Sequence, residues 1–219
     1  HEEGPGQNEI DFRYSDPLTA ADNTLTFQAV VKTVAERNGL YADFSPKPLR
    51  HQPGNGFHIN ISVKGGNCED PLSHMIAGIL AHISELTVFL NPTVASYERF
   101  GGPKAPEYIS WSNQNRSQLI RVPAAVDAYR RAELRSPDPT TNPYLAFALL
   151  IYAGLDGIQQ KLPLPAPTDL NLFTASADIL AGLQRLPLTL REAATLAANS
   201  SFVSQYLPKT IVQTYYNQR

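Results

Sequence analysis

The chain has 219 residues, of which 42% are hydrophobic and 17% are charged, and its formal net charge is −2. This length suffices for one large domain with a sizeable core, and the near balance of charges gives no reason to expect a nucleic acid or a membrane as a partner. The single cysteine excludes an internal disulfide, which fits a reducing, cytoplasmic location.

Residues 1–14, HEEGPGQNEIDFRY, place two glutamates on either side of a tight turn. Beyond the Gly-Pro-Gly turn, polar and apolar residues alternate up to Tyr14, which predicts a half-buried strand. The turn allows Glu2 and Glu9 to meet as hard oxygen ligands of one Mg²⁺ or Mn²⁺ ion. Glutamates beside a turn are also common as solvated side chains, and this segment alone leaves both interpretations open.

Residues 22–38 have the pattern of an amphipathic helix that Asp22 or Asn23 caps and Gly39 ends. The expected buried stripe consists of Leu25, Phe27, Val30, Val31 and Val34. No side chain in this helix suggests chemistry.

Residues 54–63, GNGFHINISV, predict a strand that follows a glycine-containing loop. Four apolar residues face one way, and His58, Asn60 and Ser62 face the other. Gly54 and Gly56 allow the backbone to approach a ligand closely. His58 is either a ligand of a metal or anion, or a structural histidine.

Residues 70–90 predict a long amphipathic core helix, with Asp70 as its cap, Pro71 in its first turn and Asn91-Pro92 at its end. The segment 97–106 that follows contains two glycines and two prolines, so we expect a loop. Such a loop is either a mobile lid over a site or an ordinary surface connection.

Residues 116–135 concentrate five arginines, the side chain best suited to binding carboxylate and phosphate with two parallel hydrogen bonds. Alternation places Arg121 on one face of a strand, and it places Glu133 and Arg135 together on one face of the next. The cluster indicates either a site for an anionic substrate with a metal nearby or a solvated surface of salt bridges.

A further helix begins at the cap Asn142 and continues to about Lys161, apolar nearly all round and therefore central. Its apolar run, 145–155, is too short to span a bilayer. More helices are expected at about 177–186, 189–198 and 208–216. The sequence has no phosphate loop, dinucleotide fingerprint or zinc-type Cys/His spacing.

Five segments together resemble the C-terminal catalytic domain of glutamine synthetase, the ATP-dependent glutamate–ammonia ligase. They are HEEGPGQNEI (1–10), GNGFHINIS (54–62), NPTVASYERFG (91–101), NRSQLIRVPAA (115–125) and ELRSPDPTTNPYLAFALLIYAGLDG (133–157), in the family's order. We therefore expect residues 1–219 to form one domain of this type. Because the chain starts inside a motif and without Met, we expect a longer protein that supplies an N-terminal small domain and the first catalytic strands.

The resemblance implies an α+β fold whose mostly antiparallel, curved sheet forms an open half-barrel, lined with polar residues and covered by helices. It also implies glutamate, ATP and ammonium as substrates, Mg²⁺ or Mn²⁺ as cofactor, and a dodecamer-like homo-oligomer with active sites between subunits.

The family's motifs imply roles for individual residues of this chain. The implied metal ligands are Glu2 and Glu9 for one ion, and His58 and Glu133 for another. Gly54 would offer its backbone to glutamate, Arg99 would bind the glutamate carboxylate, and Arg135 would lie near the substrate and the transferred phosphate. The implied nucleotide contacts are Ser62, Arg116, Arg121 and Arg131, and the arginines, Arg116 and Arg135 among them, would stabilise phosphoryl transfer.

Two positions depart from the family's pattern. The flap motif Glu-Ala-Pro reads Lys104-Ala105-Pro106 here, and the family's glutamate is both lid and proton acceptor. A lysine has the wrong charge to attract ammonium. Phe173 stands roughly where some bacterial members carry an adenylylated tyrosine, so that regulation should be missing.

Two functional hypotheses follow. The first is a ligase in which Lys104 changes efficiency or amine choice. The second is a non-catalytic or altered-specificity homologue, acting as a γ-glutamyl-amine ligase or as a nucleotide- or glutamate-binding assembly subunit. The metal and arginine positions favour the first hypothesis, and Lys104 favours the second. The 219 residues alone are expected to be inactive, because they supply only part of each metal's ligand set.

Overall fold

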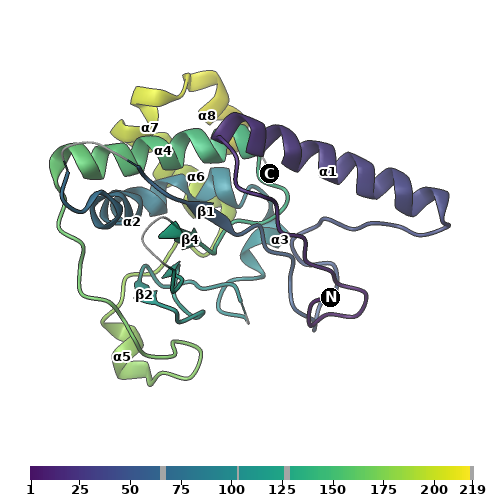
Figure 1. Ribbon diagram of the computed structural model, residues 1–219, viewed down its shortest axis with the longest axis horizontal. Helices are drawn as coiled ribbons and strands as arrows, with labels where there is room; N and C mark the ends of the chain where they lie inside the picture. Colours follow the sequence, from purple (N-terminus) through teal and green to yellow (C-terminus); the bar gives the residue numbers. More distant parts are fainter. Residues whose placement is uncertain (65–67, 103, 126–128, 218–219) are drawn as a thin grey trace.

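The computed structural model describes residues 1–64, 68–102, 104–125 and 129–217 (Figure 1). Its helices are α1 (Pro17–Arg37), α2 (Pro71–Leu90), α3 (Val94–Tyr97), α4 (Pro143–Gln160), α5 (Ala177–Ala181), α6 (Leu190–Asn199), α7 (Ser201–Tyr206) and α8 (Lys209–Tyr216). Its strands are β1 (Ile59–Ile61), β2 (Trp111–Asn113), β3 (Ile120–Val122) and β4 (Ala132–Leu134). The predicted α+β class is confirmed.

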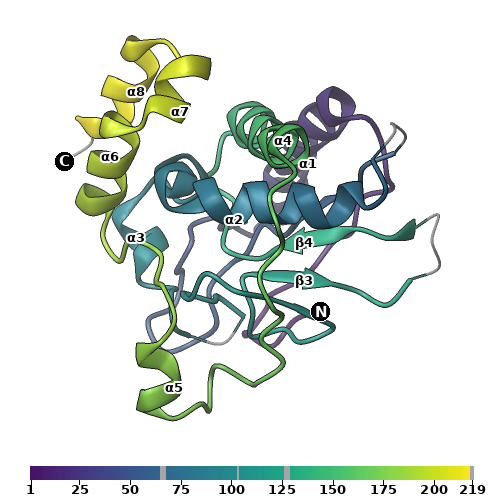
Figure 2. The same cartoon turned by 90° about the vertical axis from the view of Figure 1, so that its left-hand side faces the viewer.

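The strands form one small open sheet in the order β1-β4-β3-β2. β4 pairs antiparallel with β1 and β3, whereas β2 pairs parallel with β3, so the sheet is mixed and mostly antiparallel. Figure 2 shows β3 and β4 on one side of α2, with α4 and α1 on the other side. The apolar faces of β1, β3 and β4 join the same core as α2 and α4.

The two central helices begin where the sequence predicts. The Asp70 side chain accepts a hydrogen bond from the Ser73 amide, and Asn142 accepts one from the Tyr144 amide at 3.0 Å. α2 is long and apolar enough to cross a membrane by length and composition, but 61% of that stretch is buried inside the fold. Its apolar surface is therefore explained by packing against α4 and α6.

The strand predicted up to Tyr14 is wrong. Backbone hydrogen bonds near it are local, from Glu2 N to Gln7 O at 2.8 Å and from Gln7 N to Gly4 O at 3.0 Å. Ile10, Phe12 and Tyr14 are exposed, and no strand in the described part of the chain pairs with them. Alternation describes two faces but does not provide the neighbouring strand that a β-ladder requires.

The prediction for the first helix is wrong at its start and in its buried face. α1 begins at Pro17, because Asp16 caps it by accepting from the Leu18 and Thr19 amides at 3.1 and 3.0 Å. Ala21 and Thr24 are its buried residues, in the half that lies over α4, whereas the other half extends away from the body (Figure 1). The predicted stripe therefore does not form core: Leu25, Val30 and Val34 are exposed, and Phe27 and Val31 are half-buried.

Other predicted elements are shorter than expected. Of the strand at 54–63, only β1 pairs with a neighbour, and of the helix at 177–186, only α5 forms. β2, α3 and α7 were not predicted from the sequence. The predicted loop at 97–106 follows α3, and one of its residues, 103, lies outside the described part.

His82 links three helices of the core. Its Nδ1 lies 2.5 Å from Glu85 Oε1, its Nε2 lies 3.0 Å from Asp156 Oδ2 on α4, and its ring stacks on Phe202 of α7. Burial would lower the pKa of His82, but the hydrogen bonds to the two carboxylates outweigh burial and raise it. The same contacts lower the pKa of Asp156 and, against burial, that of Glu85.

We expect His82→Gln to destabilise the protein by about 1 kcal/mol at pH 5.5 and by less at pH 8.5. Because the folded pKa of His82 is raised, its contribution is complete below its ordinary value of 6.5 and is lost as pH rises through the folded value. Urea unfolding of both proteins at the two pH values measures this. A loss of stability that is equal at both pH values would show that His82 contributes by packing alone.

Candidate functional site

Glu133 is the centre of a charged group on the polar face of the sheet. It lies on β4 between two strands, in register with Asn60 of β1 and Arg121 of β3. Arg121 Nε donates to Glu133 Oε2, and Arg135 Nη1 donates to Glu133 Oε1 at 2.6 Å. His58 Nδ1 lies 3.3 Å from the same Oε1. Glu133 and Arg135, which alternation predicted to share a face, are therefore in direct contact.

Glu133 and Arg135 are buried, His58 and Arg121 are half-buried, and the four side chains shift one another's protonation. Burial would raise the pKa of Glu133, but the hydrogen bond from His58 and the charges of Arg135 and Arg121 outweigh burial and lower it to about 2. Burial lowers the pKa of His58, although Glu133 opposes this shift. At neutral pH the site therefore presents a carboxylate and an uncharged imidazole.

A carboxylate and an uncharged imidazole are suitable donors for a divalent cation. A Cβ at Gly56 would lie 3.1 Å from His58 Nε2, so the absence of a side chain there leaves space beside this nitrogen. The chemistry of these two residues therefore fits the metal that the resemblance implies. Both oxygens of Glu133 already accept hydrogen bonds from arginines, so only part of their capacity remains for a metal ion.

A second charged group lies on the N-terminal turn. The carboxyls of Glu2 and Glu9 are neighbours, and Lys104 Nζ bonds Glu2 Oε2 and lies 3.4 Å from Glu3 Oε1. Glu9, and then Lys104, lowers the pKa of Glu2 to about 2, and Glu2 raises the pKa of Glu9. The turn thus brings the two predicted ligands together, and it adds a cation that was not foreseen.

Across the described ranges, 1–64, 68–102, 104–125 and 129–217, no three His, Cys, Asp or Glu side chains gather in an arrangement that could hold a metal ion. The pair Glu2 and Glu9 and the pair His58 and Glu133 each offer two donors. Each pair is thus only part of a coordination shell.

Gln7 connects the N-terminal turn to the glycine loop before β1, a role that was not predicted from the sequence. Its Nε2 donates to Gly54 O at 3.1 Å and to Asn55 Oδ1 at 2.9 Å. The carbonyl of Gly54 is thus held by protein. The only sequence signal for this role is the position of Gln7 inside the motif HEEGPGQNE.

Arg99 lies beneath the same glycine loop, and it is 3% exposed. Its guanidinium donates to Ser136 O at 3.0 Å and to Pro137 O at 3.4 Å, and it is 3.8 Å from Asp138. Burial, only partly offset by Asp138, lowers the pKa of Arg99 to about 10. A Cβ at Gly54 would lie 2.8 Å from Arg99 Cγ, so only glycine permits this approach. Arg99 supports the loop here, and substrate binding by Arg99 stays a prediction.

The predicted nucleotide contacts lie around the same face. Arg116 is exposed, and its carbonyl accepts from Arg135 Nε at 3.1 Å. Arg131, directly before β4, donates from its Nε to Asn60 Oδ1 of β1 at 3.0 Å. Ser62 is half-buried directly after β1. Together with Arg121, these residues continue the polar face that carries Glu133.

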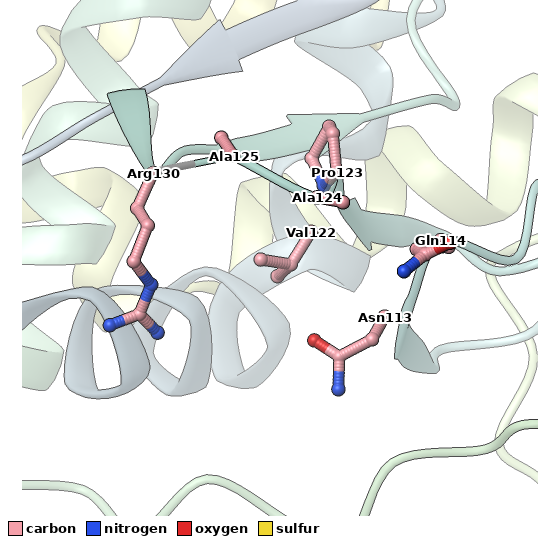
Figure 3. A pocket seen from close by; sticks show the side chains of 7 residues that line it. All are labelled: Asn113, Gln114, Val122, Pro123, Ala124, Ala125 and Arg130. Carbon is pink, nitrogen blue, oxygen red and sulfur yellow. The ribbon is translucent and has the colours of Figure 1, made fainter. Parts of the chain in front are cut away.

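A separate cavity of about 210 Å³ lies at the end of β2 and β3 (Figure 3). Its lining residues are Asn113, Gln114, Val122, Pro123, Ala124, Ala125 and Arg130. Because Val122 and Arg121 are neighbours on one strand, the cavity lies on the opposite face of β3 from Arg121. The cavity is therefore distinct from the charged group around Glu133.

Comparisons with known proteins agree on one family. The sequence matches the family described as glutamine synthetase, catalytic domain, over residues 1–219. A glutamine synthetase of Methanosarcina mazei is 45% identical over 230 aligned residues, covering 98% of this chain and 52% of that protein. One of Staphylococcus aureus is 41% identical, covering 100% of this chain and 52% of that protein.

Solved structures give the same result. A GmaS/ADP complex in conformation 1 has a TM-score of 0.87 and 31% identity, covering 99% of this chain and 53% of that chain. An apo GmaS without ligand has a TM-score of 0.79 and 30% identity, covering 93% and 50%. The chain spans about half the length of the curated relatives it matches. Since the family match extends over the whole sequence, the chain belongs to the glutamine synthetase catalytic-domain family.

Proposed function

We propose that the protein containing this chain ligates ammonia to the side-chain carboxylate of glutamate, with ATP consumed through a γ-glutamyl phosphate. The observation that carries the proposal is the charged group in which Glu133 is held by Arg121, Arg135 and His58. Its chemistry suits a substrate that carries phosphate, because guanidiniums bind and neutralise phosphoryl oxygens. The ligase family of the chain supports the same reaction.

Phosphoryl transfer requires little covalent help and much charge stabilisation. A bound Mg²⁺ or Mn²⁺ would supply Lewis-acid polarisation of the phosphoryl oxygens, with His58 and Glu133 among its ligands. Arg121 and Arg135 bring positive charge to the same face, and Glu133 fixes their orientation through paired hydrogen bonds. Arg116, Arg131 and Ser62 are the proposed nucleotide contacts, and Gly54 and Arg99 the proposed glutamate contacts. We further propose a cytoplasmic homo-oligomer.

Lys104 supports an alternative in which the amine substrate is not ammonia, or in which the protein has no catalytic activity. A lysine cannot accept the ammonium proton at neutral pH, and here Glu2 and Glu3 raise its pKa against the effect of burial. The structural similarity to GmaS, one structure of which is a complex with ADP, supports nucleotide binding under either alternative.

The test is an assay of the full-length protein with glutamate, ATP and Mg²⁺, in which ammonium is compared with a panel of primary amines and polyamines. We expect ADP and phosphate to form only when both glutamate and an amine are present, with one amine preferred. Product identity by mass spectrometry distinguishes glutamine from a γ-glutamyl-amine. An absence of ATP turnover with every amine would refute the ligase proposal.

A further inference from the structure

The contact between Lys104 and Glu2 joins two segments that are each held by their own hydrogen bonds. On one side, Gly101 N donates to Ala105 O at 3.0 Å, and Lys104 has a φ of 65°, in the left-handed region that tight turns use. On the other side, Gln7 fixes the N-terminal turn on the Gly54 loop. The ammonium and the carboxylate therefore come from two segments that each have hydrogen bonds of their own.

The contact is also partly shielded from solvent. The side chains of Lys104 and Glu2 are 28% and 23% exposed, and that of Glu3 is 60% exposed. Ion pairs at this level of exposure are screened less than those on an open surface. Lys104 therefore provides the nearest positive charge to the Glu2–Glu9 pair among the contacts described.

One carboxylate cannot give its full charge to an ammonium and to a divalent ion at once. A divalent ion needs both Glu2 and Glu9 as unencumbered oxygen donors, and Mg²⁺ in particular loses its water reluctantly. The ammonium satisfies Glu2 and repels a second cation. The two cations therefore compete for this position.

We propose that the Lys104 ammonium is the resident cation of the Glu2–Glu9 pair and competes with a divalent ion there. This inference rests on the proposed function, since the family resemblance behind that proposal implies Glu2 and Glu9 as metal ligands. It gives the lysine in the flap motif a role of its own. Lys104 positions Glu2 and lowers the metal affinity of one of the two proposed metal positions.

The test is calorimetric titration of the full-length protein with Mn²⁺ at one fixed pH. We expect Lys104→Gln to raise the Mn²⁺ affinity at least about tenfold, as expected when a group bound to a metal ligand is changed. Lys104→Arg keeps the charge and should bind Mn²⁺ as the wild type does. Lys209→Gln, which removes a lysine charge on the distant α8, is the matched control and should also have no effect.

Adding Glu2→Gln to Lys104→Gln should cancel the gain in affinity. An unchanged or weaker affinity in Lys104→Gln, or an equal gain in Lys209→Gln, would overturn the inference. A gain that Glu2→Gln cancels, in a protein without ATP-dependent ligation, would refute the proposed function and leave the inference standing. Ligation activity, together with no gain in Mn²⁺ affinity in Lys104→Gln, would support the proposed function and overturn the inference.

Discussion

Glu133→Gln is expected to lower ATP-dependent ligation by about 100-fold, because it removes one proposed metal ligand and the charge that orients two arginines. Glu133 is 5% exposed, and its oxygens accept from Arg121 and from Arg135. The substitution keeps the shape of the side chain but leaves two guanidiniums side by side with no buried counter-charge. We also expect a loss of unfolding free energy of about 3 kcal/mol, since one partner of a buried charge pair is removed.

The control is Glu36→Gln, which removes the same charge from an exposed position on α1. The activity and the urea unfolding of Glu36→Gln should match those of the wild type. Measuring kcat and KM separately distinguishes the roles of Glu133. A change in KM for ATP alone would point to ground-state binding, whereas a fall in kcat would support a role in phosphoryl transfer. Wild-type rates in Glu133→Gln would remove Glu133 from the proposed site.

The sequence predicted α2 and α4 well because their signals are local. Each has a capping residue, a proline in its first turn and a long apolar surface, and these act within one element. The start of α1 was missed although Asp16-Pro17 carries the same local signal, a capping residue followed by a proline in the first turn. The strand up to Tyr14 was predicted but does not form, because the existence of a partner strand is not a local property.

The features of the site also divide into those that a local pattern encodes and those that it does not. Alternation along one strand was enough to place Glu133 and Arg135 on one face, and the family motifs added Arg121 and His58 from two other segments. The bond from Lys104 to Glu2 joins residues that are 102 positions apart, and no local pattern encodes it. The support that Gln7 gives to Gly54 spans 47 positions and was missed for the same reason.

The close contact between α2 and α4 gives the other large expected effect. A Cβ at Gly78 would lie 2.1 Å from Ala153 O, and a Cβ at Gly157 would lie 2.1 Å from His74 O. Both contacts are with backbone of the opposite helix, which cannot move unless the helices separate. Alanine in place of either glycine should therefore lower the unfolding free energy by about 3 kcal/mol, although alanine favours helix by about 1 kcal/mol.

Two other glycines provide graded controls for this prediction. At Gly154 the added Cβ would meet Met75 Cγ at 2.6 Å, and this flexible side chain can move, so we expect a loss of about 1 kcal/mol. At Gly182 the nearest atom is 3.5 Å away, and the change should stay within about 0.5 kcal/mol. Thermal and urea unfolding of the four alanine variants tests the order. If Gly78→Ala and Gly157→Ala were as stable as Gly182→Ala, the two helices would not pack backbone to backbone, because no side-chain movement can accommodate a methyl group at 2.1 Å from a carbonyl oxygen.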